Sequence, residues 1–125
     1  AVPKICLIVR KAYGAGLYAM NGPAYDADCV IALPTAKLAV MGPEPAINAV
    51  YFNKMAEMSA EEKKKFIIEK TNEYEADVNI YKLAGELIVD HMVDFAEARE
   101  ELIKRFGFYA LKRYDKSRLP GIMPM

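Results

Sequence analysis

The segment RKAYGAGLYAM, residues 10–20, is the part of the sequence that is most informative about the fold. The apolar run ICLIV precedes it at residues 5–9, and its β-branched members predict a buried strand. Helix-forming residues follow Gly16, and the triplet NGP at residues 21–23 stops them. The sequence therefore predicts a strand, a turn of small residues and a short helix.

The turn Gly14-Ala15-Gly16 has two interpretations. Small residues let another group approach the backbone closely, and the start of a helix leaves amide N–H groups unpaired and partly positive. Such a turn can hold an oxyanion through backbone donors. A glycine-rich turn between a strand and a helix can equally be no more than a tight connection. These observations leave both interpretations open.

Composition limits the class of protein. The chain has 125 residues, of which 54% are hydrophobic and 27% charged, so we expect one globular α/β domain. Lys and Arg number 17, as do Asp and Glu, which argues against a basic surface for nucleic acid. No apolar run reaches the length of a membrane span, and no signal peptide is visible.

The cysteines and the single histidine bear on location and on metal binding. Cys6 and Cys29 lie in apolar runs, so we expect buried thiols in a reducing compartment, and hence a cytoplasmic protein. His91 is the only histidine, which excludes a His-based zinc cluster, and we expect no metal site.

Three apolar runs of strand length occupy residues 2–9, 29–33 and 37–41. We expect Arg10 and Lys11 to end the first of them. Short buried strands with tight joins predict one layer of a sheet with helices on both sides.

Helix starts and a fourth strand are indicated in the remainder of the chain. Residues 42–44 (GPE) place proline at a helix start, and Ser59 with Glu62 forms a capping-box pattern. Residues 80–87 are expected to be helical and residues 88–93 a short strand. A second capping pattern at 94–97 precedes an amphipathic helix whose apolar stripe runs from Phe95 to Tyr109, and residues 119–125 look like an extended tail.

Three motifs now form a recognisable series: RKAYGAG at residues 10–16, LPTA at 33–36 and AVMG at 39–42. In this order they resemble the carboxyltransferase (beta) subunit of biotin-dependent acyl-CoA carboxylases and decarboxylases, a member of the crotonase-like (ClpP/crotonase) superfamily. The segment IVDHMVD at 88–94, followed by Arg99, resembles that family's late strand and last helix. Ile122 and Pro124 resemble its C-terminal end.

The resemblance implies a partial domain. Residues 1–125 match the C-terminal portion of the second of two crotonase-like domains. In the family, the first domain mostly binds acyl-CoA and the second mostly binds carboxybiotin. The active site forms where the first domain of one subunit meets the second domain of another.

The resemblance also implies partners and a cofactor. Expected partners are acyl-CoA, a biotinylated carrier protein, the remaining part of the carboxyltransferase subunit and further copies in a hexamer-type homo-oligomer. Biotin would be carried on a separate domain or subunit.

The implied reaction is carboxyl transfer between carboxybiotin and an acyl-CoA. Negative charge develops on the ureido oxygen, and fixed N–H donors stabilise such charge. The resemblance matches the amides of Ala15 and Gly16 to the biotin-side oxyanion hole. The liberated biotin nitrogen takes the substrate proton, so no His or Glu base is required. The positions implied for substrate or biotin binding are Tyr13, Gly14, Tyr18, Pro34 and Thr35.

Three departures from the family's usual residues matter. The family often has Gly-Gly-Ala where this chain has Gly14-Ala15-Gly16, although methylcrotonyl-type members carry Gly-Ala-Gly. Propionyl-type members carry an acid at the position of Tyr18, so a methylcrotonyl-like pocket is favoured over a propionyl-CoA pocket. Leu33 stands where the family often has Trp.

Alternatives remain for the function and for single residues. The chain could be a non-catalytic interaction fragment that completes a larger acyl-CoA enzyme. A crotonase-like hydratase or isomerase normally needs a Glu near the turn, and residues 13–23 contain none. Arg10 and Lys11 could end a strand or contact phosphate or another subunit, and Tyr13 and Tyr18 could be packing residues. We expect the fragment alone to be inactive.

Overall fold

The computed structural model describes residues 2–112 of the chain. The elements follow one another in the order β1 (Ile5–Ile8), β2 (Lys11–Tyr13), α1 (Ala15–Ala19), the 3₁₀ helix η1 (Pro23–Tyr25), β3 (Cys29–Ala32), β4 (Lys37–Ala39), α2 (Pro43–Ala56), α3 (Ala60–Asp77), α4 (Ile80–Gly85), β5 (His91–Met92) and α5 (Ala98–Tyr109).

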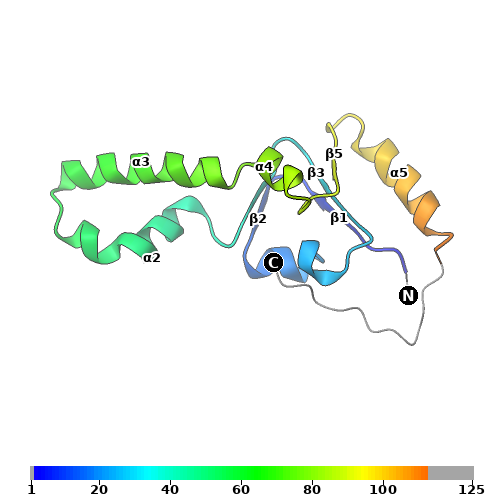
Figure 1. Ribbon diagram of the computed structural model, residues 1–125, viewed down its shortest axis with the longest axis horizontal. Coiled ribbons are helices and arrows are strands. Elements are labelled where there is room, and N and C mark those ends of the chain that lie inside the picture. The colour runs from blue at the N-terminus through cyan, green and yellow to red at the C-terminus, as the bar shows by residue number, and fades with distance from the viewer. Residues whose placement is uncertain (1, 113–125) are drawn as a thin grey trace.

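The strands form two parallel sheets (Figure 1). The first contains three strands in the order β1-β3-β5, and the second pairs β2 with β4. The chain passes from the first sheet to the second twice, from β1 into β2 and from β3 into β4. The expectation of a single layer was therefore wrong.

Strand β2 was not expected, because Arg10 and Lys11 were predicted to end the strand before them. Instead the chain bends after β1 and pairs again, with Lys11 opposite Lys37 and Tyr13 opposite Ala39. The carbonyl of Arg10 accepts a hydrogen bond of 2.7 Å from the amide of Lys37. A strand of three residues with a charged first residue has no local pattern of its own, so its pairing with β4 decides its conformation.

The three-stranded sheet separates two apolar cores. The larger core contains Cys6, Ile8, Leu17, Val30, Ala32, Ala36, Leu38, Ile80 and Val89. The smaller core contains Cys29, Ile31, Leu33, Val93 and Ala98, with Ile5, Leu7, Leu102 and Tyr109 packed against it. Alternate residues of β1 and β3 thus face opposite cores. Helices α1 and α4 contribute to the larger core and α5 to the smaller one, which confirms helices on both sides.

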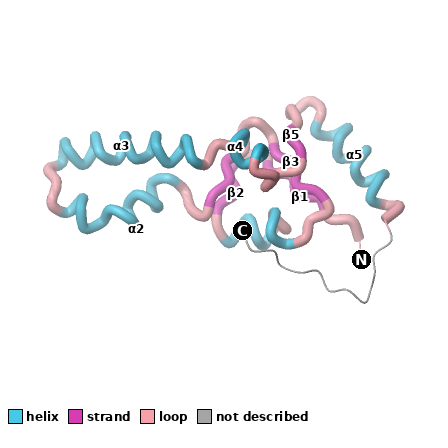
Figure 2. The backbone as a smooth tube through the Cα atoms, viewed as in Figure 1, coloured by secondary structure: helices cyan, strands magenta, loops and turns pink. Residues whose placement is uncertain are grey.

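Helices α2 and α3 form a hairpin that projects away from the sheets (Figure 2). Ser59 begins α3 with a complete capping box, because its side chain accepts from the Glu62 amide and the Glu62 carboxylate accepts from the Ser59 amide. This confirms the predicted helix start. The phenol of Tyr74 donates to the carbonyl of Met41 (2.8 Å) and ties α3 to the end of β4.

The start of α5 differs from the prediction. Its N-cap residue is Glu97, which makes no side-chain capping bond, and the carbonyl of Asp94 accepts from the amides of Glu97 and Ala98. Phe95 precedes the helix and is 80% exposed, so it does not belong to the inward stripe. The expected tail at residues 119–125 lies outside the described residues.

Cys6 and Cys29 are buried and free, as expected. Burial raises the pKa of both thiols, which stay protonated near neutral pH and are poor nucleophiles. The cytoplasmic location inferred from them stays a prediction.

Candidate functional site: the Gly14-Ala15-Gly16 turn

Gly14 joins β2 to α1 in a conformation that requires glycine. Its backbone has φ 56° and ψ −137°, a combination that residues with a side chain adopt only under strain. A Cβ atom placed there would lie 2.9 Å from the carbonyl oxygen of Val40. The Gly14 amide donates to the carbonyl of Ala39 (3.1 Å), so the β2–β4 ladder holds the turn in place.

The amides of Ala15 and Gly16 begin α1. Both residues are exposed, and a Cβ on Gly16 would meet nothing within 4 Å. The Leu17 amide donates a hydrogen bond to the Gly14 carbonyl (3.1 Å). Within residues 2–112, by contrast, neither Ala15 nor Gly16 donates a backbone hydrogen bond. The turn therefore contains two neighbouring N–H groups, on exposed residues, that have no backbone acceptor within residues 2–112, and the buried side chain of Leu17 anchors the helix that they begin.

Tyr13 lies beside the turn. Its ring packs near Gly42, where an added Cβ would lie 3.4 Å from the ring. Tyr13 also lines a cleft of about 570 Å³ between the β2–β4 ladder and the α2–α3 hairpin. Tyr18 is half-buried on α1, and its ring centroid lies 5.7 Å from that of Tyr25. The rings of both tyrosines thus make packing contacts within the chain. Their substrate-binding role stays a prediction.

Pro34 and Thr35 lie at the other end of the β2–β4 ladder. They precede its first pair, Lys11 with Lys37, whereas Gly14 follows its last pair. The Thr35 hydroxyl donates a hydrogen bond to the carbonyl of Val9 (2.8 Å). This bond connects the loop between β3 and β4 to the residue that follows β1. Within residues 2–112 the fold does not bring these two residues to the Gly14–Gly16 turn, and their binding role also stays a prediction.

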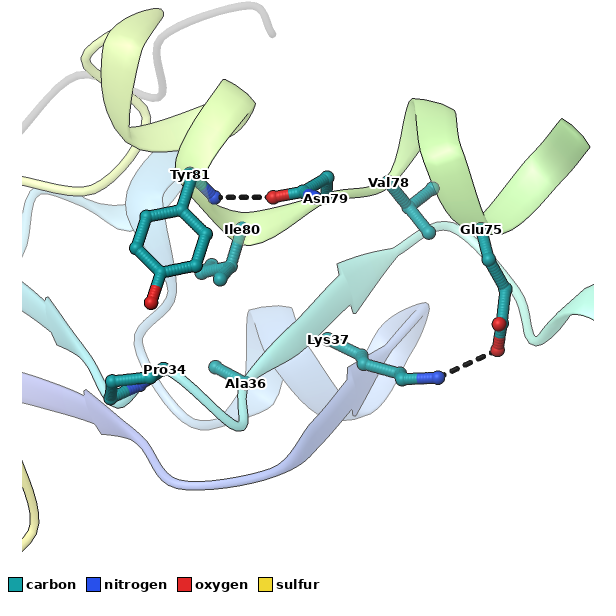
Figure 3. Close-up of a pocket in the computed structure, with 8 residues that line it drawn as sticks. All are labelled: Pro34, Ala36, Lys37, Glu75, Val78, Asn79, Ile80 and Tyr81. Atoms are coloured by element: carbon teal, nitrogen blue, oxygen red, sulfur yellow. Dashed lines mark hydrogen bonds and ion pairs between the residues drawn. The ribbon is translucent and has the colours of Figure 1, made fainter. Parts of the chain in front are cut away.

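Pro34 lines a separate pocket of about 230 Å³ between this link and the start of α4 (Figure 3). At its rim, Lys37 forms an ion pair with Glu75 at 2.6 Å. The hydrogen bond from Lys37 to Glu75 raises the pKa of the lysine. Asn79 caps α4, because its side-chain oxygen accepts from the Tyr81 amide (2.9 Å). The pocket is thus bordered by groups that are already paired.

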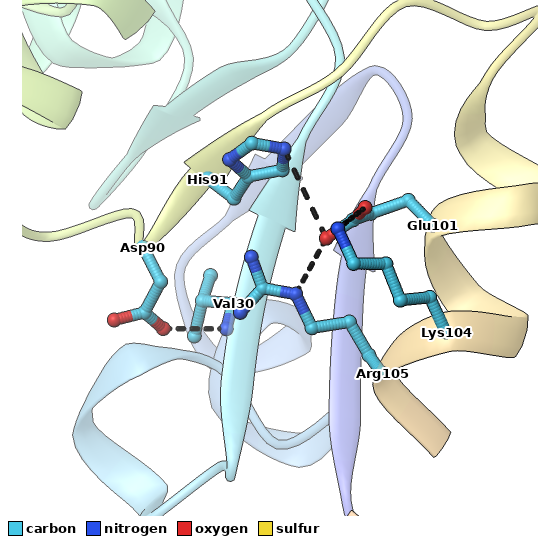
Figure 4. A network of polar contacts seen from close by, with 6 residues as sticks. All are labelled: Val30, Asp90, His91, Glu101, Lys104 and Arg105. Carbon is cyan, nitrogen blue, oxygen red and sulfur yellow. Dashed lines mark hydrogen bonds and ion pairs between the residues drawn. The ribbon is translucent and has the colours of Figure 1, made fainter. Parts of the chain in front are cut away.

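A polar network on the first sheet was not predicted (Figure 4). Arg105 donates to Glu101 at 2.5 Å within α5, and His91 of β5 lies 3.9 Å from the same carboxylate oxygen. The hydrogen bond that Arg105 donates to Glu101 lowers the pKa of the carboxyl group and raises the pKa of the guanidinium. The spacing Glu101 to Arg105 on a helix was the one sequence signal that could have indicated this pair.

Residues 2–112 contain no group of three or more His, Cys, Asp or Glu side chains arranged to hold a metal ion. Among the same residues, no helix combines the length and apolar character needed to cross a membrane.

Comparison with known proteins places this geometry in a family. Residues 1–119 match the carboxyl transferase domain. The chain is 57% identical over 111 residues to the uncharacterized carboxylase YngE of Bacillus subtilis, which covers 89% of this chain and 22% of that protein. It is also 36% identical over 116 residues to the methylmalonyl-CoA carboxyltransferase 12S subunit of Propionibacterium freudenreichii, covering 92% and 22%.

A solved structure of transcarboxylase 12S, with methylmalonyl-CoA and methylmalonic acid bound, superposes with a TM-score of 0.80 at 34% identity. The match covers 92% of this chain and 22% of that one. The chain therefore has a crotonase-like carboxyltransferase fold and belongs to the carboxyl transferase domain family. It spans about a fifth of the length of the curated relatives that it matches.

Proposed function

We propose that this chain supplies the biotin side of a carboxyltransferase active site, through the backbone amides of Ala15 and Gly16. The observation that carries the proposal is the pair of N–H groups without a backbone acceptor, on two exposed residues next to Gly14, whose own amide is bonded to the Ala39 carbonyl. A preorganised donor pair suits an oxygen that becomes negatively charged during reaction. Residues 1–125 would then be the C-terminal portion of the second crotonase-like domain.

Carboxybiotin, delivered on a separate carrier protein, would bring the carboxyl group that is exchanged with an acyl-CoA. Ala15 and Gly16 are both exposed, so the turn is accessible to such a group in the described chain. The two amides would hold the ureido oxygen and stabilise its charge. Donors that are already oriented need little reorganisation as the charge grows.

The acyl-CoA side would come from the rest of the carboxyltransferase subunit, and the working enzyme would be a homo-oligomer. The structure of transcarboxylase 12S is described as a hexamer assembly with methylmalonyl-CoA and methylmalonic acid bound, which supports this proposal.

An ester in place of the Gly16 amide tests the role of the turn. In a complete carboxyltransferase carrying this sequence, the ester removes one N–H with little change of shape. The rate of carboxyl transfer should fall by about 10²–10³, the usual effect of one lost oxyanion donor. Gly16→Pro should do the same by removing the donor, although proline also constrains φ.

Two controls separate catalysis from structure. An ester at Leu17 removes a donor that is already bonded to Gly14, so it should lower stability more than the rate per folded enzyme. Arg10→Ala should act on binding or assembly. Full activity of the folded Gly16 ester would mean that the turn is only a tight connection.

A further inference from the structure

Helix α1 ends in a cap of two backbone hydrogen bonds. The Asn21 amide donates to the Tyr18 carbonyl (3.0 Å), and the Gly22 amide donates to the Leu17 carbonyl (3.0 Å). Asn21 has φ 60°, the left-handed conformation that usually belongs to glycine at the end of a helix and that asparagine also tolerates. The cap therefore depends on the backbone at Asn21 and Gly22.

Gly22 is tightly packed as well as bonded. A Cβ atom at this position would lie 2.7 Å from Cδ1 of Leu17 and 2.8 Å from the Leu17 carbonyl oxygen. The Leu17 side chain is itself buried in the larger core. The peptide group between Asn21 and Gly22 therefore cannot turn unless Leu17 or the end of α1 moves.

The side-chain nitrogen of Asn21 lies in an unusual environment. The Nδ2 atom is buried, and within residues 2–112 it has no hydrogen-bond partner. A carboxylate oxygen in its place would bring negative charge to a buried position where no donor from the described residues compensates it. The cap thus accepts an amide at residue 21 and opposes an acid there.

An asparagine followed by glycine carries an intrinsic reaction, because glycine has no side chain to shield its backbone nitrogen. That nitrogen attacks the side-chain Cγ of the asparagine, and a new C–N bond closes a succinimide ring. The bond from Cγ to Nδ2 breaks, and Nδ2 leaves as ammonia with the proton that the backbone nitrogen gives up. Water then opens the ring to aspartate or isoaspartate.

We infer that Asn21–Gly22 is a deamidation site that the cap of α1 keeps unreactive, and that it reacts only when the end of α1 opens. The attack requires Gly22 to give up its N–H, to lose its bond to Leu17 and to turn its peptide group. The product cannot rebuild the cap, because it places a charge at the buried position or lengthens the main chain. The inference does not depend on the role proposed for Ala15 and Gly16.

The rate of deamidation tests the protection. A complete carboxyltransferase carrying this sequence is incubated at mildly alkaline pH, and the peptide that contains residue 21 is analysed for aspartate and isoaspartate by mass spectrometry. A synthetic peptide of residues 18–25 (YAMNGPAY) gives the rate without the cap. We expect the folded protein to react at least about 100-fold more slowly, because only opened molecules react. Equal rates would overturn the inference.

Two buried leucines distinguish opening of α1 from global unfolding. Leu17 and Leu38 are each 6% exposed and belong to the same core, so alanine at either position removes a comparable contact. Leu17→Ala should raise the deamidation rate of the folded protein by at least about tenfold, because it removes the side chain packed on Gly22. Leu38→Ala is the matched control and should raise the rate less. Equal acceleration by both variants would contradict gating by the cap.

The effect of the product is tested without altering the core. Asn21→Asp should lower the unfolding midpoint, because of the uncompensated charge at the Nδ2 position. Asn21→Gly should not lower it, because glycine adopts the left-handed conformation without strain. An Asn21→Asp variant as stable as the unmodified protein would show that the cap tolerates the acid, contrary to the inference.

Discussion

Val30 and Asp90 exchange two hydrogen bonds across 60 residues of sequence (Figure 4). The Val30 amide donates to the Asp90 carboxylate (2.7 Å), and the Asp90 amide donates to the Val30 carbonyl (2.9 Å). Strand β5 contains only His91 and Met92, so it has no earlier residue to pair with Val30. The Asp90 carboxylate accepts the hydrogen bond from Val30 in place of such a residue. Asp90 therefore has a structural role, which its position in an apolar run did not reveal.

Replacing Asp90 should destabilise the protein. Asp90→Ala leaves the amide of the buried Val30 without its acceptor, and an unsatisfied buried donor costs about 1–3 kcal/mol. Asp90→Asn keeps an acceptor oxygen and should lose less. Urea unfolding of both variants measures the difference, and equal stability of Asp90→Ala and the unmodified chain would contradict the assigned role.

Gly14→Ala should be destabilising and Gly16→Ala should not. At Gly14, the backbone conformation and the Val40 carbonyl both oppose a Cβ, and a strained backbone of this kind costs about 1–3 kcal/mol. At Gly16 the added methyl group meets nothing, and alanine favours a helix by up to about 1 kcal/mol. The free energies of unfolding of the two variants test this contrast.

Stability should depend on pH through Glu101. The hydrogen bond from Arg105 lowers its pKa in the folded state, so the ionised carboxylate stabilises the fold above the unfolded pKa, near 4.3. That contribution is lost as pH falls from this value through the lowered folded pKa. Glu101→Gln should be less stable than the unmodified chain at neutral pH, and the gap should close in acid. Urea midpoints from pH 7 to pH 3 provide the measurement, and a gap that stays constant would rule out this linkage.

The chain alone should not carboxylate acyl-CoA. Its proposed contribution is one side of a composite site, and it spans about a fifth of its relatives. Purified chain would be incubated with free carboxybiotin and a series of acyl-CoA thioesters, and carboxylated products would be sought by mass spectrometry. A complete carboxyltransferase subunit serves as the positive control. Product from the chain alone would refute the composite site.

Several elements and the family could be predicted from the sequence, because their signals are local. Ser59 and Glu62 are three residues apart, so the capping box was visible without a fold. The apolar run at β3 and the glycine turn were visible for the same reason. Three motifs within residues 10–42 indicated the carboxyltransferase family, which the comparison confirms. The roles of Ala15 and Gly16 stay predictions.

Only the tertiary structure decided how these pieces pair. The division into two sheets depends on the pairing of Lys11–Tyr13 with Lys37–Ala39. Neither segment has a sequence pattern that identifies the strand with which it pairs. Thr35 bonds to Val9 across 26 residues and Asp90 to Val30 across 60. Propensity and periodicity act between neighbours in sequence, whereas these contacts form between residues that packing brings together. For the same reason the sequence indicated that α5 is amphipathic, but only the folded chain decided that Ala98, Leu102 and Tyr109 face the smaller core.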